Sequence, residues 1–140
     1  MKGTLIEFAR SLGHKVEDLG PFEPKAGDDY PDFVIPLAKK VAGQPSTEVR
    51  GVVVAGSGQG EIIAMNRVRG ARAALFCPCN LDLIKASRDH NDSNIFSIGA
   101  RFCTLEQAKE AVKLWLDTPF SGDERHVRRL AKIEALVPSA

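Results

Sequence analysis

Residues 49–55 constrain the fold more than any other part of this sequence. They form a largely apolar, β-branched run that ends in glycines, and residues 61–68 then follow a helical pattern. Such a run is typical of a strand that is buried on both faces, as strands of parallel sheets are. The segment therefore predicts a strand followed by a helix within a parallel sheet.

Strands and helices alternate along the rest of the chain. Strands are expected over residues 16–19, 71–76 and 94–98. Helical spacing of apolar residues predicts helices over residues 5–12, 31–41, 81–87, 105–115 and 124–136. Pro36 is expected to distort the second of these helices, and Thr104 with Gln107 forms a capping-box pattern. The alternation predicts a three-layer α/β fold with a mostly parallel sheet.

Length and charge narrow the class of protein. The 140 residues suit one domain, residues 1–140, in which residues 121–140 form a C-terminal helix or arm. The formal net charge of +1 gives no bulk attraction for nucleic acid or a membrane. No apolar run approaches a membrane span, and charged residues interrupt the first apolar stretch, so we expect a cytoplasmic protein.

The cysteines do not form a recognisable metal or redox motif. Cys77 and Cys79 are separated by one residue rather than two, and no second pair follows them. Together with Cys103 they make an odd number in a chain without an export signal. We therefore expect three free thiols with a structural role.

A glycine-rich segment follows the strand at residues 49–55. Gly56, Gly58 and Gly60, with Ser57 among them, allow a tight turn that aims several amides at one point. Such a turn either binds an anion or only connects two elements. Glu61 comes next, and it either stabilises the helix dipole or acts as a general base beside an oxyanion site.

Other candidate residues lie near the later strand and in the last helix. His90 and Asn91 belong to a polar cluster that precedes residues 94–98, and Arg101 follows that strand. Arg125 and Arg129 are four residues apart and share a helix face. A charge run is usually a solvated face, but this spacing also suits clamping of a phosphate.

These segments together resemble the ribose-5-phosphate isomerase B family, which includes galactose-6-phosphate isomerase subunits. The resemblance is carried by short stretches in the family's order, across nearly the whole chain. They are Asp29-Tyr30-Pro31, Gly56-Ser57-Gly58-Gln59-Gly60-Glu61-Ile62-Ile63-Ala64-Met65-Asn66-Arg67, Gly70-Ala71-Arg72-Ala73-Ala74, His90-Asn91-Asp92-Ser93-Asn94, Gly99-Ala100-Arg101 and Arg125-His126-Val127-Arg128-Arg129.

The resemblance implies a doubly wound, Rossmann-like subunit and an aldose–ketose isomerase of the pentose phosphate pathway that uses no metal or cofactor. Its substrate would be a sugar phosphate, foremost ribose 5-phosphate, which it would convert to ribulose 5-phosphate through an enediolate. Its members are usually homodimers that share active sites between subunits, and a tetramer is also compatible. Allose and galactose phosphates remain open as substrates.

The resemblance also implies a role for each candidate residue. Glu61 would be the base, because this chain has Ala55 where many members carry a catalytic cysteine, as in the subgroup that uses glutamate. His90 would open the sugar ring, and Ser57 with the amides of Gly56, Gly58 and Gly60 would hold the enediolate oxygen. The remaining residues would bind substrate: Asp29, Asn91, Arg101, Arg125 and Arg129.

One departure from the family concerns the first strand. Family members open with a strand and an Asp-His-Ala-Gly type motif, whereas this chain begins at the helix that follows. We therefore expect a sheet without that strand and a pocket without its residues. The alternative to an active isomerase is a non-catalytic or hetero-oligomeric sugar-phosphate binder with an incomplete site.

Overall fold

Three parallel strands form the centre of the computed structural model, which describes residues 1–23, 25–76, 78 and 80–137. Strand β1 spans Gly51–Ala55, β2 spans Ala73–Leu75 and β3 spans Ile95–Gly99, in the spatial order β1-β3-β2. Ala55 pairs with Gly99, so β1 and β3 end side by side. This places the loops that follow the two strands next to each other.

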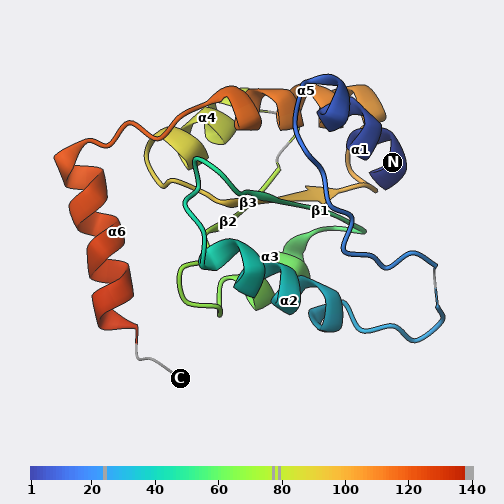
Figure 1. The fold of residues 1–140 in the computed structure, drawn as a ribbon, viewed down its shortest axis with the longest axis horizontal. Helices are drawn as coiled ribbons and strands as arrows, with labels where there is room; N and C mark the ends of the chain where they lie inside the picture. The colour runs from blue at the N-terminus through green and yellow to red at the C-terminus, as the bar shows by residue number, and fades with distance from the viewer. Residues whose placement is uncertain (24, 77, 79, 138–140) are drawn as a thin grey trace.

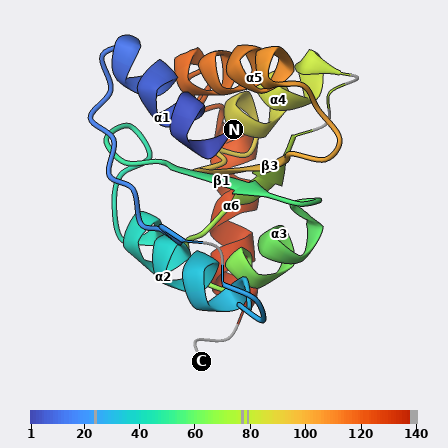
Figure 2. The same ribbon diagram turned by 90° about the vertical axis from the view of Figure 1, so that its right-hand side faces the viewer.

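Helices cover both faces of the sheet, which confirms the three-layer, doubly wound α/β fold (Figures 1 and 2). Helices α1 (Lys2–Ser11), α4 (Leu81–Asp89) and α5 (Leu105–Asp117) lie on one face. Helices α2 (Pro31–Ala42) and α3 (Gln59–Met65) lie on the other face. Helix α6 (Glu124–Leu136) stands apart from both layers.

Alternate residues of β3 pack into two separate cores. Phe96 and Ile98 join the core under α1, α4 and α5, where the Phe96 and Trp115 rings stack at 5.2 Å. Ile95 joins the core under α2 and α3. Every residue of β3 is buried, as the central position of this strand requires.

Most predicted elements are present, with boundaries that shift by a few residues. The capping box between Thr104 and Gln107 is formed, with a 2.8 Å bond from the Thr104 amide to the Gln107 side chain. Helix α3 begins at Gln59 rather than at Glu61. Helix α2 continues through Pro36. None of the helices in the described ranges is long and apolar enough to cross a membrane.

Two expectations about strands are wrong. Residues 16–19 have no regular secondary structure, because a strand requires a partner and this segment joins none of the three described strands. The strand predicted at 49–55 begins at Gly51 and is only partly buried, because it occupies an edge of the described sheet. Cys77 and Cys79 fall outside the described residues, and Cys103 is a free thiol.

Candidate active site

Gly58 fixes the shape of the loop between β1 and α3. It caps α3 with a φ of 78°, a left-handed conformation that favours glycine. A Cβ atom at this position would lie 2.7 Å from both Leu75 Cδ1 and Ser97 Oγ. The Ser97 hydroxyl also donates a 3.2 Å hydrogen bond to the Gly58 carbonyl. The loop is therefore held tightly against the ends of β2 and β3.

The start of α2 reaches the same loop through Tyr30. A Cβ atom at Gly60 would lie 2.7 Å from Tyr30 Cζ and Oη, so the end of the Tyr30 ring packs directly on the backbone of this glycine. Asp29 immediately precedes Tyr30 and is exposed. Glu61 is half-buried in the first turn of α3. Asp29 and Glu61 therefore belong to two segments that meet at the carboxyl end of β1.

Arg101 packs onto the glycine loop from the neighbouring strand. The Ala100 and Arg101 amides donate to the Ala55 and Gly56 carbonyls at 2.8 and 3.1 Å. A Cβ atom at Gly56 would lie 3.3 Å from the Arg101 guanidinium carbon. Ser57 is exposed, and its hydroxyl accepts a 3.3 Å bond from the Gln59 amide. We call this group the carboxyl-end half-site: Asp29, residues 56–61 and Arg101.

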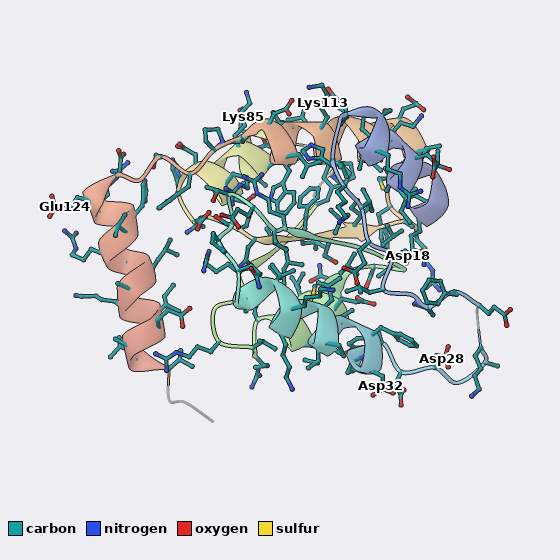
Figure 3. All side chains as sticks on the ribbon, in the orientation of Figure 1. Asp18, Asp28, Asp32, Lys85, Lys113 and Glu124 are labelled. Carbon is teal, nitrogen blue, oxygen red and sulfur yellow. The ribbon has the colours of Figure 1, made fainter. Side chains whose placement is uncertain are left out.

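The remaining candidate residues lie at the other end of the sheet. His90 and Asn91 follow α4 and precede β3, and Arg125 and Arg129 belong to α6. Strand β3, five residues long, separates these ends by about 13 Å. In Figure 3, Glu124 at the start of α6 and Asp28 and Asp32 beside the start of α2 lie at opposite ends of the molecule. We call His90, Asn91, Arg125 and Arg129 the amino-end half-site.

A partly buried ionic network, centred on the buried Arg88, shapes the turn that carries His90 and Asn91. Asp92 has a φ of 46°, and its carboxylate accepts bonds from Arg72 at 2.8 Å, Arg88 at 2.9 Å and the Ser46 hydroxyl at 2.7 Å. Arg88 is only 1% exposed and also donates to the Ser93 carbonyl. The backbone after Asn91 is thus held by several charge-assisted hydrogen bonds.

Two histidine rings stack at the amino-end half-site. The rings of His90 and His126 lie 4.6 Å apart between centroids, at an angle of 16°. His126 is buried, and burial, followed by the nearby charge of Arg125, lowers its pKa below the usual value. His90 is exposed, and its Nε2 lies 3.2 Å from Asp89 Oδ2.

Sequence reasoning assigned no role to Ser97, Asp92 or His126. Ser97 gave no signal, because a serine within an apolar strand has many explanations. Asp92 and Arg88 are four residues apart in and after a helix, which is a recognisable ion-pair spacing. His126 lies between the two arginines already singled out. Within the described ranges, no cluster of three or more His, Cys, Asp or Glu side chains could hold a metal ion.

The fold, together with the residues at the carboxyl ends of its strands, indicates a class of protein. A parallel α/β sheet with a glycine loop at the carboxyl ends of its strands, flanked by an arginine and a carboxylate, is typical of domains that bind small anionic molecules. Residues 1–133 match the Ribose/Galactose Isomerase family. The chain belongs to this family of isomerases.

Several relatives carry more specific names. The chain is 37% identical to ribose-5-phosphate isomerase B of Mycobacterium tuberculosis, over 93% of this chain and 78% of the relative. It is 43% identical to a putative sugar phosphate isomerase of Bacillus subtilis, over 95% of this chain and 86% of the relative. The structure of the Mycoplasma genitalium isomerase B with bound ribulose-5-phosphate superposes with a TM-score of 0.87 at 34% identity, covering 96% of this chain and 86% of that one.

Proposed function

We propose that this chain is an aldose–ketose isomerase that interconverts ribose 5-phosphate and ribulose 5-phosphate. The observation that carries the proposal is the position of Glu61, in the first turn of α3 directly after the glycine loop and on the edge that also holds Arg101. A carboxylate in the first turn of a helix suits proton removal from a carbon next to a carbonyl, because the free amides of that turn can stabilise the negative charge that develops. The ribulose-5-phosphate in the similar Mycoplasma structure supports this substrate class.

The reaction has three steps in this proposal. His90 gives a proton to the ring oxygen of the furanose as the bond from C1 to that oxygen breaks, and the anomeric hydroxyl gives its proton to water, which leaves the open-chain aldehyde. Glu61 then removes the proton from C2, and the electron pair moves into the C1–C2 bond and onto O1. Ser57 and the amides of residues 56–60 stabilise this enediolate oxygen. Return of the proton to C1, with loss of the O2 proton to O1, gives the ketose.

Different residues bind different parts of the substrate. Arg101, Arg125 and Arg129 bind the phosphate through charge-assisted hydrogen bonds. Asn91 contacts the sugar hydroxyls, and Asp29 lines the pocket. The carboxylate of Glu61 takes the role that a thiol has in other members, because Ala55 at the end of β1 has no reactive group.

We further propose that two copies of the chain build each site as a homodimer. The two half-sites of one chain lie at opposite ends of the sheet, so they cannot contact one sugar phosphate together. The carboxyl-end half-site of one protomer meets the amino-end half-site of its partner in this arrangement. An isologous dimer then contains two equivalent sites.

The surface of α6 supports the dimer. His126 is the buried residue of this helix, whereas the large apolar side chains of Val127, Ile133 and Leu136 are exposed. Exposed apolar residues gathered on one helix are typical of a protein interface. In the dimer, α6 would lie against the partner and carry Arg125 and Arg129 to the partner's glycine loop.

The substitution Glu61→Gln tests the proposed base. We expect isomerisation of ribose 5-phosphate to fall by at least about a thousandfold, because the amide cannot accept the C2 proton. Binding of inorganic phosphate, measured by calorimetry, should stay within about twofold, because the arginines are unchanged. Turnover is measured by the appearance of ribulose 5-phosphate, with allose and galactose 6-phosphates assayed in parallel.

Glu106→Gln is the matched control, because Glu106 also lies in the first turn of a helix but is exposed on α5. It should retain full activity. A nearly normal rate in Glu61→Gln would remove Glu61 from the mechanism. Phosphate binding without turnover of any of the three sugars by the unmodified chain would instead establish the non-catalytic binder.

A further inference from the structure

His126 is a buried polar side chain that the proposed mechanism does not use. It is 5% exposed, and its Nε2 has no hydrogen-bond partner among the described residues. The His126 ring stacks nearly parallel on the His90 ring, with 4.6 Å between the ring centroids and 16° between the ring planes. A buried imidazole nitrogen without a partner is costly, so the ring is placed there at some expense of stability.

We propose that His126 is a positioning residue, whose ring holds the His90 imidazole in one orientation for opening of the sugar ring. This inference rests on the proposed function. The His90 side chain is 46% exposed, and its other close polar neighbour is Asp89, on the adjacent residue. Without the stack, the His90 ring would be free to rotate among several rotamers.

The position of His126 is itself fixed by the segment that joins α5 to α6. Arg88 donates to the Thr118 carbonyl at 3.1 Å. The amide and hydroxyl of Ser121 both donate to the Asp89 carbonyl, at 3.1 and 2.7 Å. The segment that leads into α6 is therefore tied to α4 close to His90, which keeps the His126 ring beside the His90 ring.

The residues around the stacked His90 and His126 rings favour a neutral imidazole at His126. Arg125 and Arg129 lie on the same helix, and Asp123 precedes it. Burial, followed by the charge of Arg125, lowers the pKa of His126 and so favours its neutral form. A neutral aromatic ring offers a stacking face, which another aromatic residue could also provide.

Two substitutions separate stacking from the other properties of His126. His126→Ala removes the ring, and we expect kcat on ribose 5-phosphate to fall about tenfold, because a misplaced catalytic group loses orientation. KM should change less than about twofold, because the phosphate ligands remain. His126→Phe restores a ring without nitrogens and should recover kcat to within about twofold of the parent chain. His14→Ala, at an exposed histidine, is the control and should be fully active.

A double-mutant cycle tests whether His126 acts through His90. In a His90→Ala background, His126→Ala should change kcat by less than about twofold, because no ring remains to be held. A further tenfold loss there would overturn the proposal. A failure of His126→Phe to restore kcat, or a rise in KM with kcat unchanged, would also overturn it, because either result points to a nitrogen that binds substrate.

The stack also has a readout that does not depend on turnover. The chain contains three histidines, so their ring-proton NMR signals can be assigned by single substitutions. The His90 signals should lose their ring-current shift in His126→Ala and keep one in His126→Phe. Signals of His90 that do not respond to His126→Ala would overturn the inference even in an active enzyme. An inactive parent chain with a responsive His90 would instead overturn the proposed function.

Discussion

Gly58 connects the sequence of the glycine loop to the geometry of the carboxyl-end half-site. Its left-handed backbone disfavours any side chain, and an added Cβ would lie 2.7 Å from Leu75 and Ser97. At Gly60 the restriction has another cause, because an added Cβ would displace the end of the Tyr30 ring. The glycines therefore serve packing as well as turning, and both set where the amides of the loop point.

The substitution Gly58→Ala should destabilise the protein by about 2–4 kcal/mol. The left-handed conformation costs an alanine about 1–2 kcal/mol, and overlap with Leu75 and Ser97 adds about 1–2 kcal/mol. Urea unfolding measures the difference, and kcat/KM should fall by at least about tenfold, because the loop amides move.

Gly13→Ala is the matched comparison for this prediction. Gly13 also has a left-handed φ, of 92°, but a Cβ atom there would meet nothing within 4 Å. Its substitution should cost only about 1 kcal/mol and leave turnover unchanged. Equal losses for the two substitutions would mean that the contacts of Gly58 are unimportant.

At this scale the sequence predicted residue types better than contacts. Glu61 and the glycines were identified because their pattern along the chain is local. The role of Ser97 could not be predicted, because its partner Gly58 is 39 residues away and only the sheet brings them together. The stack of His90 on His126 has the same origin, since a contact between distant segments depends on the complete fold.

The connection from α4 to β3 shows how a buried ionic network shapes an element boundary. Asp92 ends the turn after His90 and Asn91, and it joins Arg88 in α4 to Arg72 before β2. Buried charges of this kind are tolerated when each is paired and hydrogen-bonded. The network therefore fixes the direction in which the chain enters the central strand.

Removal of the Asp92 carboxylate should be strongly destabilising. In Asp92→Ala the nearly inaccessible Arg88 would lose its countercharge, and an unpaired buried charge costs about 3–5 kcal/mol. Asp117→Ala breaks the exposed pair with Lys113 and should cost less than about 1 kcal/mol. Thermal unfolding of both variants checks the difference, and a similar loss of stability in both would contradict the network's role.

The elements were predictable where their signals are local. Helix α5 has its capping box and α6 has the predicted bounds, because a helix closes its own hydrogen bonds. Residues 16–19 were predicted wrongly, because their strand-like composition has no meaning without a neighbouring strand. The position of α6, apart from both layers, follows from no pattern within the helix.

At the scale of the whole molecule, the sheet separates the candidate residues into two groups. Residues that follow β1 and β3 lie at one edge, and residues between α4 and β3 lie at the other edge, together with α6. The order of elements along the chain already implies this separation, because the strands of a parallel sheet all begin at the same end of the sheet. The proposed dimer with shared sites would reconcile this separation with a single small substrate.

Complementation between two inactive variants tests the shared site. In the proposed dimer, Glu61→Gln or His90→Ala removes the same group from both sites, so each pure variant should lose at least about a hundredfold in activity and keep a small residual rate. Unfolding and refolding an equal mixture should form mixed dimers in half of the molecules. One of the two sites in each mixed dimer has both an intact Glu61 and an intact His90, so the mixture should recover about a quarter of the parent activity.

The arithmetic of this recovery distinguishes the possible arrangements. If Glu61 and His90 of the same chain served one site, each chain in the mixture would still carry a defect, and no activity would return. Refolding Glu61→Gln with Glu61→Gln/His90→Ala is the control and should stay inactive, because no chain supplies Glu61. Sedimentation of the refolded mixture verifies that dimers form. Dimers without recovered turnover would contradict the shared site and leave each half-site in need of another partner.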